Sequence, residues 1–333
     1  MRAETFHTDT DTGNGQQPAR PAVLRRPLRK ELAAVATGVV LAARHAFELY
    51  HPPLARPGRT PQNKSLPVRG LSVLTTRDRV NLDAWIVPGE GPHTVVICHG
   101  MGRTKSSVLG HVKMLHDAGH HVVAYDMRNH GESGRDRKYG SMSARYTSDL
   151  ADVIAAVRRD PEVGAGELAV IGFSFSTWVS LHVLRRLDTA VAAVVCDSGP
   201  MSDTAGGLRD FAALRRSLLP EPVREGAGYA VYRRAFSRFC MHMLAVRNWP
   251  PDLTGVPTRL MFIAGAQDPV ISEAQIMAVA DRYPDAERWT APQSMHMNAL
   301  RFDGAEYRSR VLDFLASSFT AAADRRKEAA VHG

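Results

Sequence analysis

The sequence predicts an α/β fold with a mostly parallel central sheet, helices on both of its faces and a helical cap. Two observations carry this prediction. From residue 93 onward, short apolar runs alternate with segments of helical periodicity, which is the pattern of crossover units on a parallel sheet. In addition, about sixty residues separate two of the predicted strands, far more than one crossover connection needs.

The elements follow in chain order. Residues 71–75 and 82–87 alternate apolar and polar side chains and predict an antiparallel pair with a turn near Asp78. Apolar runs predict strands at 93–98, 122–125, 168–173, 191–196, 259–264 and 287–290. Helical spacing predicts helices at 105–118, 143–159, 177–187, 272–282 and 305–319. Ligands of parallel sheets bind where the strands end, so the loops after these strands are the candidate site.

Composition excludes some classes of function. The chain has 333 residues, of which 44% are hydrophobic and 23% charged, and a formal net charge of +8. Residues 1–64 hold ten Lys and Arg against five Asp and Glu, so much of the excess charge lies near one end. A basic stripe with interleaved aromatic residues is missing from the body of the sequence, which argues against nucleic-acid binding. Cys98, Cys196 and Cys240 lack metal-ligand spacing and predict buried free thiols in a reducing compartment.

The N-terminal segment, residues 1–66, is interpreted as a disordered tail, a short helix and a proline-rich linker. We expect it to carry no catalytic residue. Basic residues precede an uncharged run from Leu32 to Ala43, which is too short to span a bilayer. A helix docked on the domain is the favoured interpretation, and the protein is expected to be cytoplasmic. Membrane-surface contact by residues 31–50 and export stay open as alternatives.

The pentapeptide Gly172-Phe173-Ser174-Phe175-Ser176 stands between a predicted strand and a predicted helix. In that context a Gly-x-Ser-x-Gly sequence forms a sharp turn that exposes the serine hydroxyl at the end of the sheet. Here serine replaces the last glycine. Ser174 is therefore the candidate nucleophile. The backbone N–H of Phe175, together with that of Met101 in a glycine-flanked turn after an earlier strand, is expected to form an oxyanion hole.

Three motifs together resemble the α/β-hydrolase superfamily: His99-Gly100 after one strand, Asp126-x-Arg128-x-x-Gly131-x-Ser133 after the next, and then the serine turn. The resemblance covers roughly residues 70–319 and implies a helical cap and esterase- or thioesterase-like chemistry. It implies that the catalytic acid follows a late strand and that the histidine lies in the last loop. It also implies that the 126–134 loop is architectural.

Asp268, in a tight turn between Gly265 and Pro269, and His296, before the last helix, meet that expectation. The order Ser174, Asp268, His296 is the order of the superfamily. In this triad the histidine takes the serine proton and the aspartate fixes the histidine tautomer. Asp197 follows an earlier strand and is a rival acid that some hydrolases use at this position.

The domain boundaries follow from the same patterns. Residues 67–196 and 259–319 are expected to form the core, 197–258 a helical cap and 320–333 a disordered tail. Within the cap, Tyr229, Tyr232, Phe236, Phe239 and Met243 share one helical face. Tyr232 and Phe236 are the expected substrate-binding residues. The arginines of residues 201–250 are interpreted as solvated, with contact to a phosphate-bearing acyl carrier as an alternative.

These observations predict a serine hydrolase that cleaves an ester or thioester with an apolar acyl part, without a cofactor. The expected partner is a small acyl substrate, free or carrier-bound. Acyl transfer or cyclisation by the same triad, and a catalytically silent scaffold, remain alternatives. No metal is expected, because His111, His116, His120 and His121 lack converging carboxylates or cysteines.

Overall fold

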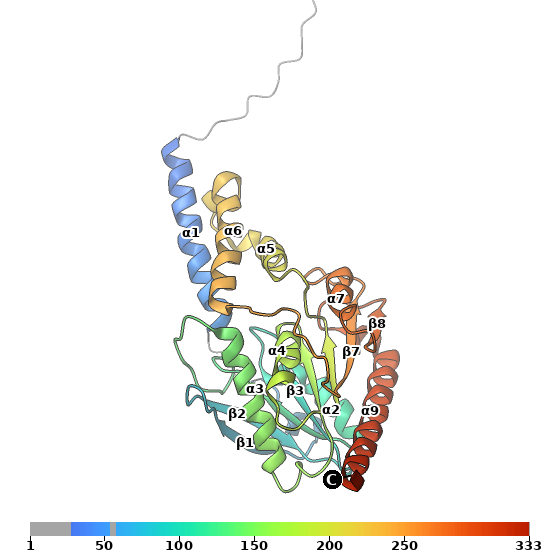
Figure 1. Ribbon diagram of the computed structural model, residues 1–333. Coiled ribbons are helices and arrows are strands. Elements are labelled where there is room, and N and C mark those ends of the chain that lie inside the picture. Colours follow the sequence, from blue (N-terminus) through green and yellow to red (C-terminus); the bar gives the residue numbers. More distant parts are fainter. Residues whose placement is uncertain (1–27, 54–57, 333) are drawn as a thin grey trace, which may run out of the picture.

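The computed structural model describes residues 28–53 and 58–332. These residues form one eight-stranded sheet in the order β1-β2-β4-β3-β5-β6-β7-β8 (Figure 1). Strands β1 and β2 run antiparallel to their neighbours, and the others are parallel. The strands are β1 (Arg69–Leu74), β2 (Asn81–Val87), β3 (Thr94–Cys98), β4 (His121–Tyr125), β5 (Leu168–Phe173), β6 (Ala193–Asp197), β7 (Arg259–Gly265) and β8 (Glu287–Ala291).

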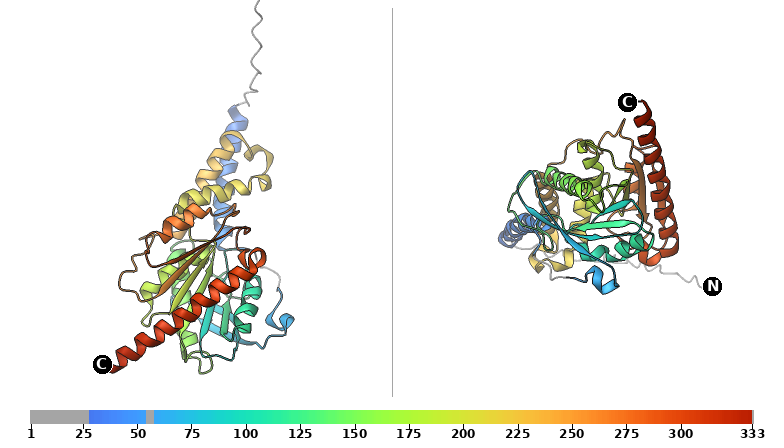
Figure 2. Two further views of the ribbon diagram at one scale, coloured as in Figure 1. Left: turned by 90° about the vertical axis from the view of Figure 1, so that its right-hand side faces the viewer. Right: turned by 90° about the horizontal axis from the view of Figure 1, so that it is seen from below.

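Helices cover both faces of this sheet, which is why the central strands are continuous apolar runs. Alternate residues of β3 point to opposite sides: Val96 and Cys98 pack in one core and Val95 and Ile97 in the other. Figure 2 shows α9 lying along one face. The core helices are α2 (Leu109–Asp117), α3 (Met142–Arg159), α4 (Phe175–Val183), α7 (Glu273–Ala280), α8 (Ala299–Phe302) and α9 (Gly304–His332).

Residues 198–258 connect β6 to β7 and contain α5 (Thr204–Leu214) and α6 (Gly226–Leu244); we call this segment the cap. The N-terminal helix α1 (Leu28–Tyr50) joins it and lies along α6, so that both project from the core (Figure 1). The two helices can approach closely because Gly38 has no side chain. An ideal Cβ at this position would lie only 2.7 Å from the backbone oxygen of Gly228. The docked helix preferred for this segment is therefore observed, although it is longer than expected.

Two other boundary predictions can be compared with the structure. The predicted disordered tail at 320–333 is wrong for residues 320–332, because α9 continues to His332. Its last turns are fixed to the core: Arg325 donates to the carbonyl of Pro257, 2.8 Å away, and Arg326 pairs with Glu167. The predicted tail at residues 1–27 lies outside the described residues. The three cysteines are buried and unpaired, as expected.

Candidate active site

Ser174 occupies a strained turn between β5 and α4. Its backbone has φ 53° and ψ −116°, a conformation that a non-glycine residue adopts only where the surroundings enforce it. Gly172 is required nearby, because a Cβ there would lie 2.6 Å from the Ser180 hydroxyl and 2.8 Å from the carbonyl of Ser176. The turn places the Ser174 hydroxyl at the carboxyl end of the sheet, where a ligand can reach it.

Ser176, which replaces the glycine of the motif, is fully buried and hydrogen-bonded. Its hydroxyl accepts from the Phe173 N–H at 2.7 Å and lies 2.6 Å from the Cys98 carbonyl, to which it donates. The hydroxyl thus ties the serine turn to the end of β3. The altered residue has its own polar partners, so the turn forms without the glycine.

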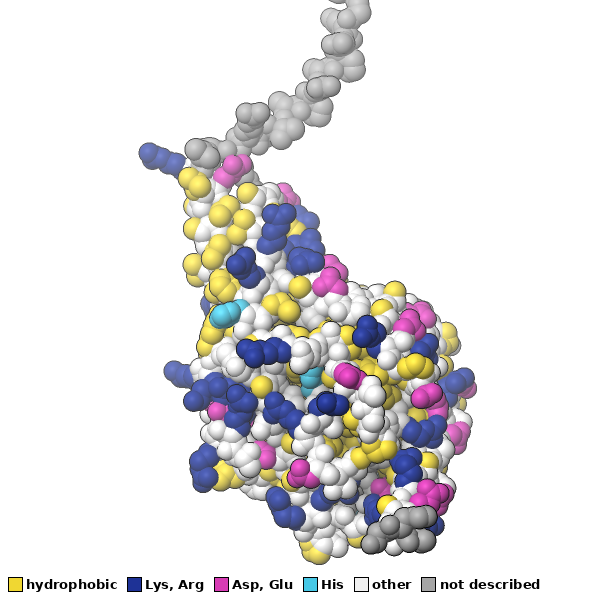
Figure 3. Space-filling view, in the orientation of Figure 1, with side chains coloured by type: hydrophobic (Ala, Val, Ile, Leu, Met, Phe, Trp, Pro, Cys, Tyr) yellow, Lys and Arg dark blue, Asp and Glu magenta, His cyan; other side chains and the backbone are white. Residues whose placement is uncertain are grey.

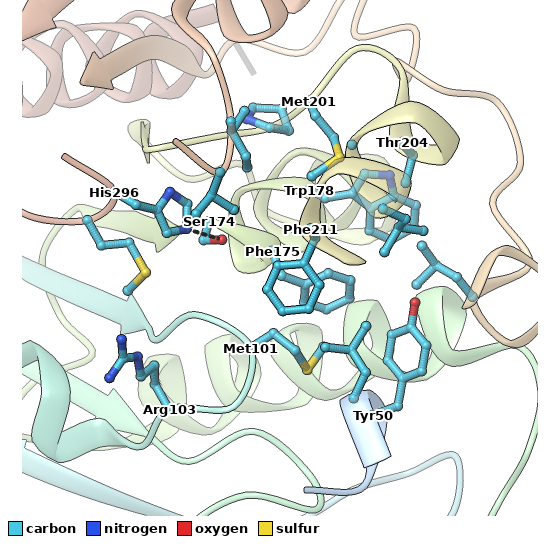
Figure 4. Close-up of a pocket in the computed structure, with 18 residues that line it drawn as sticks. Tyr50, Met101, Arg103, Ser174, Phe175, Trp178, Met201, Thr204, Phe211 and His296 are labelled. Carbon is cyan, nitrogen blue, oxygen red and sulfur yellow. Dashed lines mark hydrogen bonds between the residues drawn. The ribbon is translucent and has the colours of Figure 1, made fainter. Parts of the chain in front are cut away.

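The three predicted triad residues meet although they are far apart in the chain. Nε2 of His296 lies 2.9 Å from Oγ of Ser174, and Nδ1 of His296 lies 2.7 Å from Oδ2 of Asp268 (Figure 4 shows the Ser174–His296 pair). The other carboxylate oxygen of Asp268 accepts from the N–H groups of Val270 and Ile271, at 2.7 and 3.0 Å. The Asp268 side chain is fully buried, whereas His296 keeps 19% of its side chain exposed toward the cavity. This is the geometry that an activated serine needs.

Asp197, the rival acid, has a different set of partners. Its carboxylate accepts from the hydroxyls of Ser198 and Tyr307, at 2.8 and 2.9 Å. Ser198 in turn accepts from the backbone N–H of Met297, next to His296. Burial raises the pKa of Asp197 to about 6. Asp197 therefore supports the loop that carries His296, and Asp268 makes the direct contact with the imidazole.

The two residues expected to supply the oxyanion donors both lie beside the cavity. Met101 and Phe175 line it together with Ser174, and neither backbone N–H donates to another residue in the part of the chain that the structure describes. Phe175 is the first residue of α4, so its N–H has no intrahelical acceptor. Free N–H groups beside a nucleophile can stabilise an oxyanion that develops there.

Two buried histidines hold the Met101 loop in place, a role that the sequence did not reveal. Nε2 of His130 accepts from the Gly102 N–H, and Nε2 of His99 accepts from the Met127 N–H, both at 3.0 Å. Burial lowers the pKa of His99 to about 4 and that of His130 to about 3. Both are therefore neutral near pH 7, and together they join the loop after β3 to the loop after β4.

The loop after β4 is organised around a buried ammonium group. Nζ of Lys105 lies 2.6 Å from Asp83, 2.7 Å from Asp126 and 2.6 Å from Glu132. These three carboxylates are close enough to one another to bind a metal ion, but the ammonium group of Lys105 already forms an ion pair with each of them. In the described residues, none of the four histidines considered as metal ligands belongs to such a cluster. The loop thus has the structural role expected of it.

A cavity of about 280 Å³ opens beside Ser174 and His296 (Figure 4). Few polar side chains line it: Ser174, His296, Tyr50, Arg103 and Thr204. Most of the lining is apolar and comes from α1 (Leu49), the loop after β3 (Met101), the serine helix (Phe175, Trp178), the cap (Pro200, Met201, Leu208, Phe211, Leu244), the loop after β7 (Val270, Ile271) and the loop of His296 (Met297). Such a cavity suits an apolar group attached to the reacting carbon.

The expected substrate-binding residues Tyr232 and Phe236 do not line this cavity. Tyr232 is buried against α1, where its hydroxyl lies 3.0 Å from Nδ1 of His45. Phe236 is buried and stacks on Phe211. The helical spacing identified a buried face correctly, but that face packs on α1 and α5. Phe211, on α5, lines the cavity instead.

The N-terminal segment also contributes to the site. Leu49 and Tyr50, the last residues of α1, line the cavity, and the Tyr50 hydroxyl donates to the Cys240 carbonyl at 3.3 Å. The segment was expected to carry no catalytic residue, and none of the triad comes from it. It nevertheless shapes the cavity, which its sequence did not indicate.

Comparison with known proteins identifies relatives of the same fold. A family model described as the alpha/beta hydrolase fold matches residues 93–221. The chain superposes on the Pyrococcus furiosus esterase Pf2001 with a TM-score of 0.65 and 22% identity, over 81% of this chain and 98% of that one. It superposes on the Penicillium sp. sh18 α/β hydrolase GrgF with a TM-score of 0.59 and 18% identity, over 77% and 100% of the two chains.

An esterase from Exiguobacterium antarcticum gives a TM-score of 0.56 at 14% identity, over 74% of this chain and 100% of that one. In sequence, the chain is 27% identical over 97 residues to the uncharacterized Bacillus subtilis protein YqkD, a match that covers 29% of this chain and 30% of that relative. The matched segment of the family model and the shared architecture show that the chain has the α/β-hydrolase fold.

Proposed function

We propose that this protein is a serine hydrolase that cleaves a carboxylic ester or thioester with an apolar acyl part. The observation that carries the proposal is the contact of Ser174 Oγ with His296 Nε2, at 2.9 Å, beside an apolar cavity. The esterases among its structural neighbours support the reaction class.

The reaction begins with attack of the Ser174 oxygen on the carbonyl carbon, while Nε2 of His296 takes the hydroxyl proton. Asp268 accepts a hydrogen bond from Nδ1 of His296 and stabilises the imidazolium that forms. The negative charge on the former carbonyl oxygen is stabilised by the N–H groups of Met101 and Phe175. His296 then gives its proton to the leaving alcohol or thiol, which departs and leaves an acyl group on Ser174.

Water completes the cycle. His296, neutral again, takes a proton from a water molecule that attacks the acyl carbon, and collapse of the second intermediate returns the proton to Ser174. The cavity volume of about 280 Å³ lies just below the range for small-molecule sites, roughly 300–1,000 Å³. We therefore expect short and medium acyl chains to react better than long ones.

A panel of nitrophenyl esters and matching thioesters of rising chain length tests this proposal. We expect kcat/KM to rise with each added methylene until the cavity is filled and then to fall, with the free acid as the product. An acyl product on another acceptor in the same assay would favour the transferase alternative. A purified, folded protein that turns over no member of the panel and binds no serine-directed probe would support the silent scaffold.

A further inference from the structure

The outer side of α1 is an exposed apolar surface. Among the described residues, nine large hydrophobic side chains are exposed, and three of them lie on this helix: Leu32 at 60%, Val39 at 37% and Val40 at 67%. Ala36 is exposed on the same side, and residues 32–43 contain no charged side chain. Figure 3 shows hydrophobic side chains along this part of the projecting region. We call Leu32, Ala36, Val39 and Val40 the outer face of α1.

Packing within the chain does not account for this face. The opposite side of α1 carries Ala34, Gly38, Ala42 and Ala46, four small residues at a spacing of four, and it is this side that lies against α6. Of the most apolar 18-residue stretch of the helix, only 22% is buried. The α1–α6 contact does not require the outer face to be apolar, because polar residues there would leave that contact intact. The apolar character of the outer face therefore indicates a partner outside the described chain.

Basic side chains flank the outer face. Residues 201–250, which lie in the cap, hold eight arginines and four acidic residues. Arg234 and Arg238 are exposed on α6, beside α1, and neither forms an ion pair within the part of the chain that the structure describes. Figure 3 shows Lys and Arg side chains next to the hydrophobic strip. An apolar strip bordered by basic groups is complementary to a membrane surface that carries anionic lipids.

Helix α1 is long and apolar enough to cross a membrane by length and composition, but two features favour a position in the plane of the interface. The uncharged segment of 12 residues extends for only roughly 18 Å, compared with about 30 Å for the hydrocarbon core. Moreover, α1 is packed along α6, and insertion across the bilayer would carry the guanidinium groups of Arg234 and Arg238 into it.

We propose that the outer face of α1, with Arg234 and Arg238 of α6, docks this protein on the surface of an anionic lipid bilayer. Leu32, Val39 and Val40 enter the interfacial region of the bilayer. Arg234 and Arg238 stay on the aqueous side of that region and bind lipid phosphates there. The same helix ends at Leu49 and Tyr50, which line the cavity beside Ser174. Docking therefore holds the cavity close to the membrane. The binding itself does not depend on the proposed hydrolysis.

Co-sedimentation of the full chain with vesicles tests the proposal. One set of vesicles contains phosphatidylcholine alone and the other a mixture with phosphatidylglycerol. We expect binding to the mixed vesicles, weaker binding to the neutral ones, and a decrease with added salt. Leu32→Asp/Val40→Asp should weaken binding by roughly tenfold or more, because it removes inserted apolar groups and adds repelling charge. Arg234→Gln/Arg238→Gln should remove most of the preference for the anionic vesicles.

Controls separate docking from damage to the fold. Leu74→Asp changes a hydrophobic residue that is 50% exposed on β1, away from the cap, and should bind vesicles as the wild type does. Val40→Asp alone alters a side chain that is already in solvent, so its thermal melt should match that of the wild type. The proposal is overturned if the wild type binds neither vesicle or if Leu32→Asp/Val40→Asp binds like the wild type. A dimer that the same double substitution dissociates, without vesicle binding, would assign the face to a second copy of the chain instead.

Discussion

Replacing Asp268 by asparagine tests the assignment of the catalytic acid. In the wild type, Oδ1 of Asp268 accepts from two backbone N–H groups and Oδ2 faces Nδ1 of His296. An asparagine must keep its single side-chain oxygen toward these two N–H groups. In the opposite orientation its NH₂ group would face the two N–H groups, and no acceptor would be present between them. With the oxygen kept in place, the NH₂ group faces Nδ1, which has to become an acceptor, and the ring proton moves to Nε2.

With a proton on Nε2, His296 can no longer accept the hydrogen of Ser174. We expect kcat to fall by roughly 10³- to 10⁴-fold, as is usual when a triad histidine is held in the wrong tautomer, with a nearly unchanged melting temperature. The assay is steady-state hydrolysis of a nitrophenyl ester, beside a thermal melt.

The matched control is Asp197→Asn, which keeps the Asp268–His296 contact. It weakens the bonds to Ser198 and Tyr307 and should cost about 1–3 kcal/mol in the free energy of unfolding, with a much smaller loss of kcat. If Asp197→Asn lost more activity per folded molecule than Asp268→Asn, the assignment of the acid would be wrong.

Three further predictions concern the cavity, the serine turn and the buried histidines. Phe211→Ala should shift preference toward longer acyl chains by enlarging the cavity, whereas Tyr232→Ala should lower the melting temperature and leave the chain-length profile unchanged; a nitrophenyl ester panel beside a melt distinguishes them. Ser176→Ala leaves the buried Cys98 carbonyl without its donor and should cost about 1–3 kcal/mol of stability in urea unfolding. For His130, whose folded pKa is lowered to about 3, the unfolded state binds the proton first, so its contribution to stability is present at pH 7 and decreases below about pH 6.5. His130→Gln should therefore destabilise less at pH 5 than at pH 7, by about 2 kcal/mol, because the slope of about 1.4 kcal/mol per pH unit applies only below the unfolded-state pKa of about 6.5; urea unfolding at both pH values measures this difference.

Local patterns in the sequence were enough to predict the sheet and the three side chains that meet at its carboxyl end. The strand that precedes the serine turn is β5, Leu168–Phe173, as predicted, and the other core strands agree with their predicted ranges to within two residues at each end. Ser174, Asp268 and His296 could be found because each follows a strand or precedes a helix in a fixed order, so the topology brings them together. Periodicity and turn residues are local properties of the sequence. The parallel sheet brings the ends of its strands, and therefore these three residues, to the same edge.

The cap could not be assembled in the same way. Helical spacing shows that Tyr232 and Phe236 belong to a buried face, but it does not show which element covers that face. The close contact of Gly38 with Gly228 determines the answer, because it brings α1 onto α6. Phe211 is consequently left to line the cavity. This contact joins residues far apart in the chain, and no local pattern indicates it.

Labelling with a fluorophosphonate probe, followed by mass spectrometry of the peptides, tests the serine mechanism most directly. We expect one phosphonylated residue, Ser174, in the wild type, and neither label nor ester turnover above background in a Ser174→Ala variant that melts at the same temperature. Residual turnover at the wild-type rate in that variant, or label on another residue with Ser174 unmodified, would contradict the assignment of Ser174 as the nucleophile.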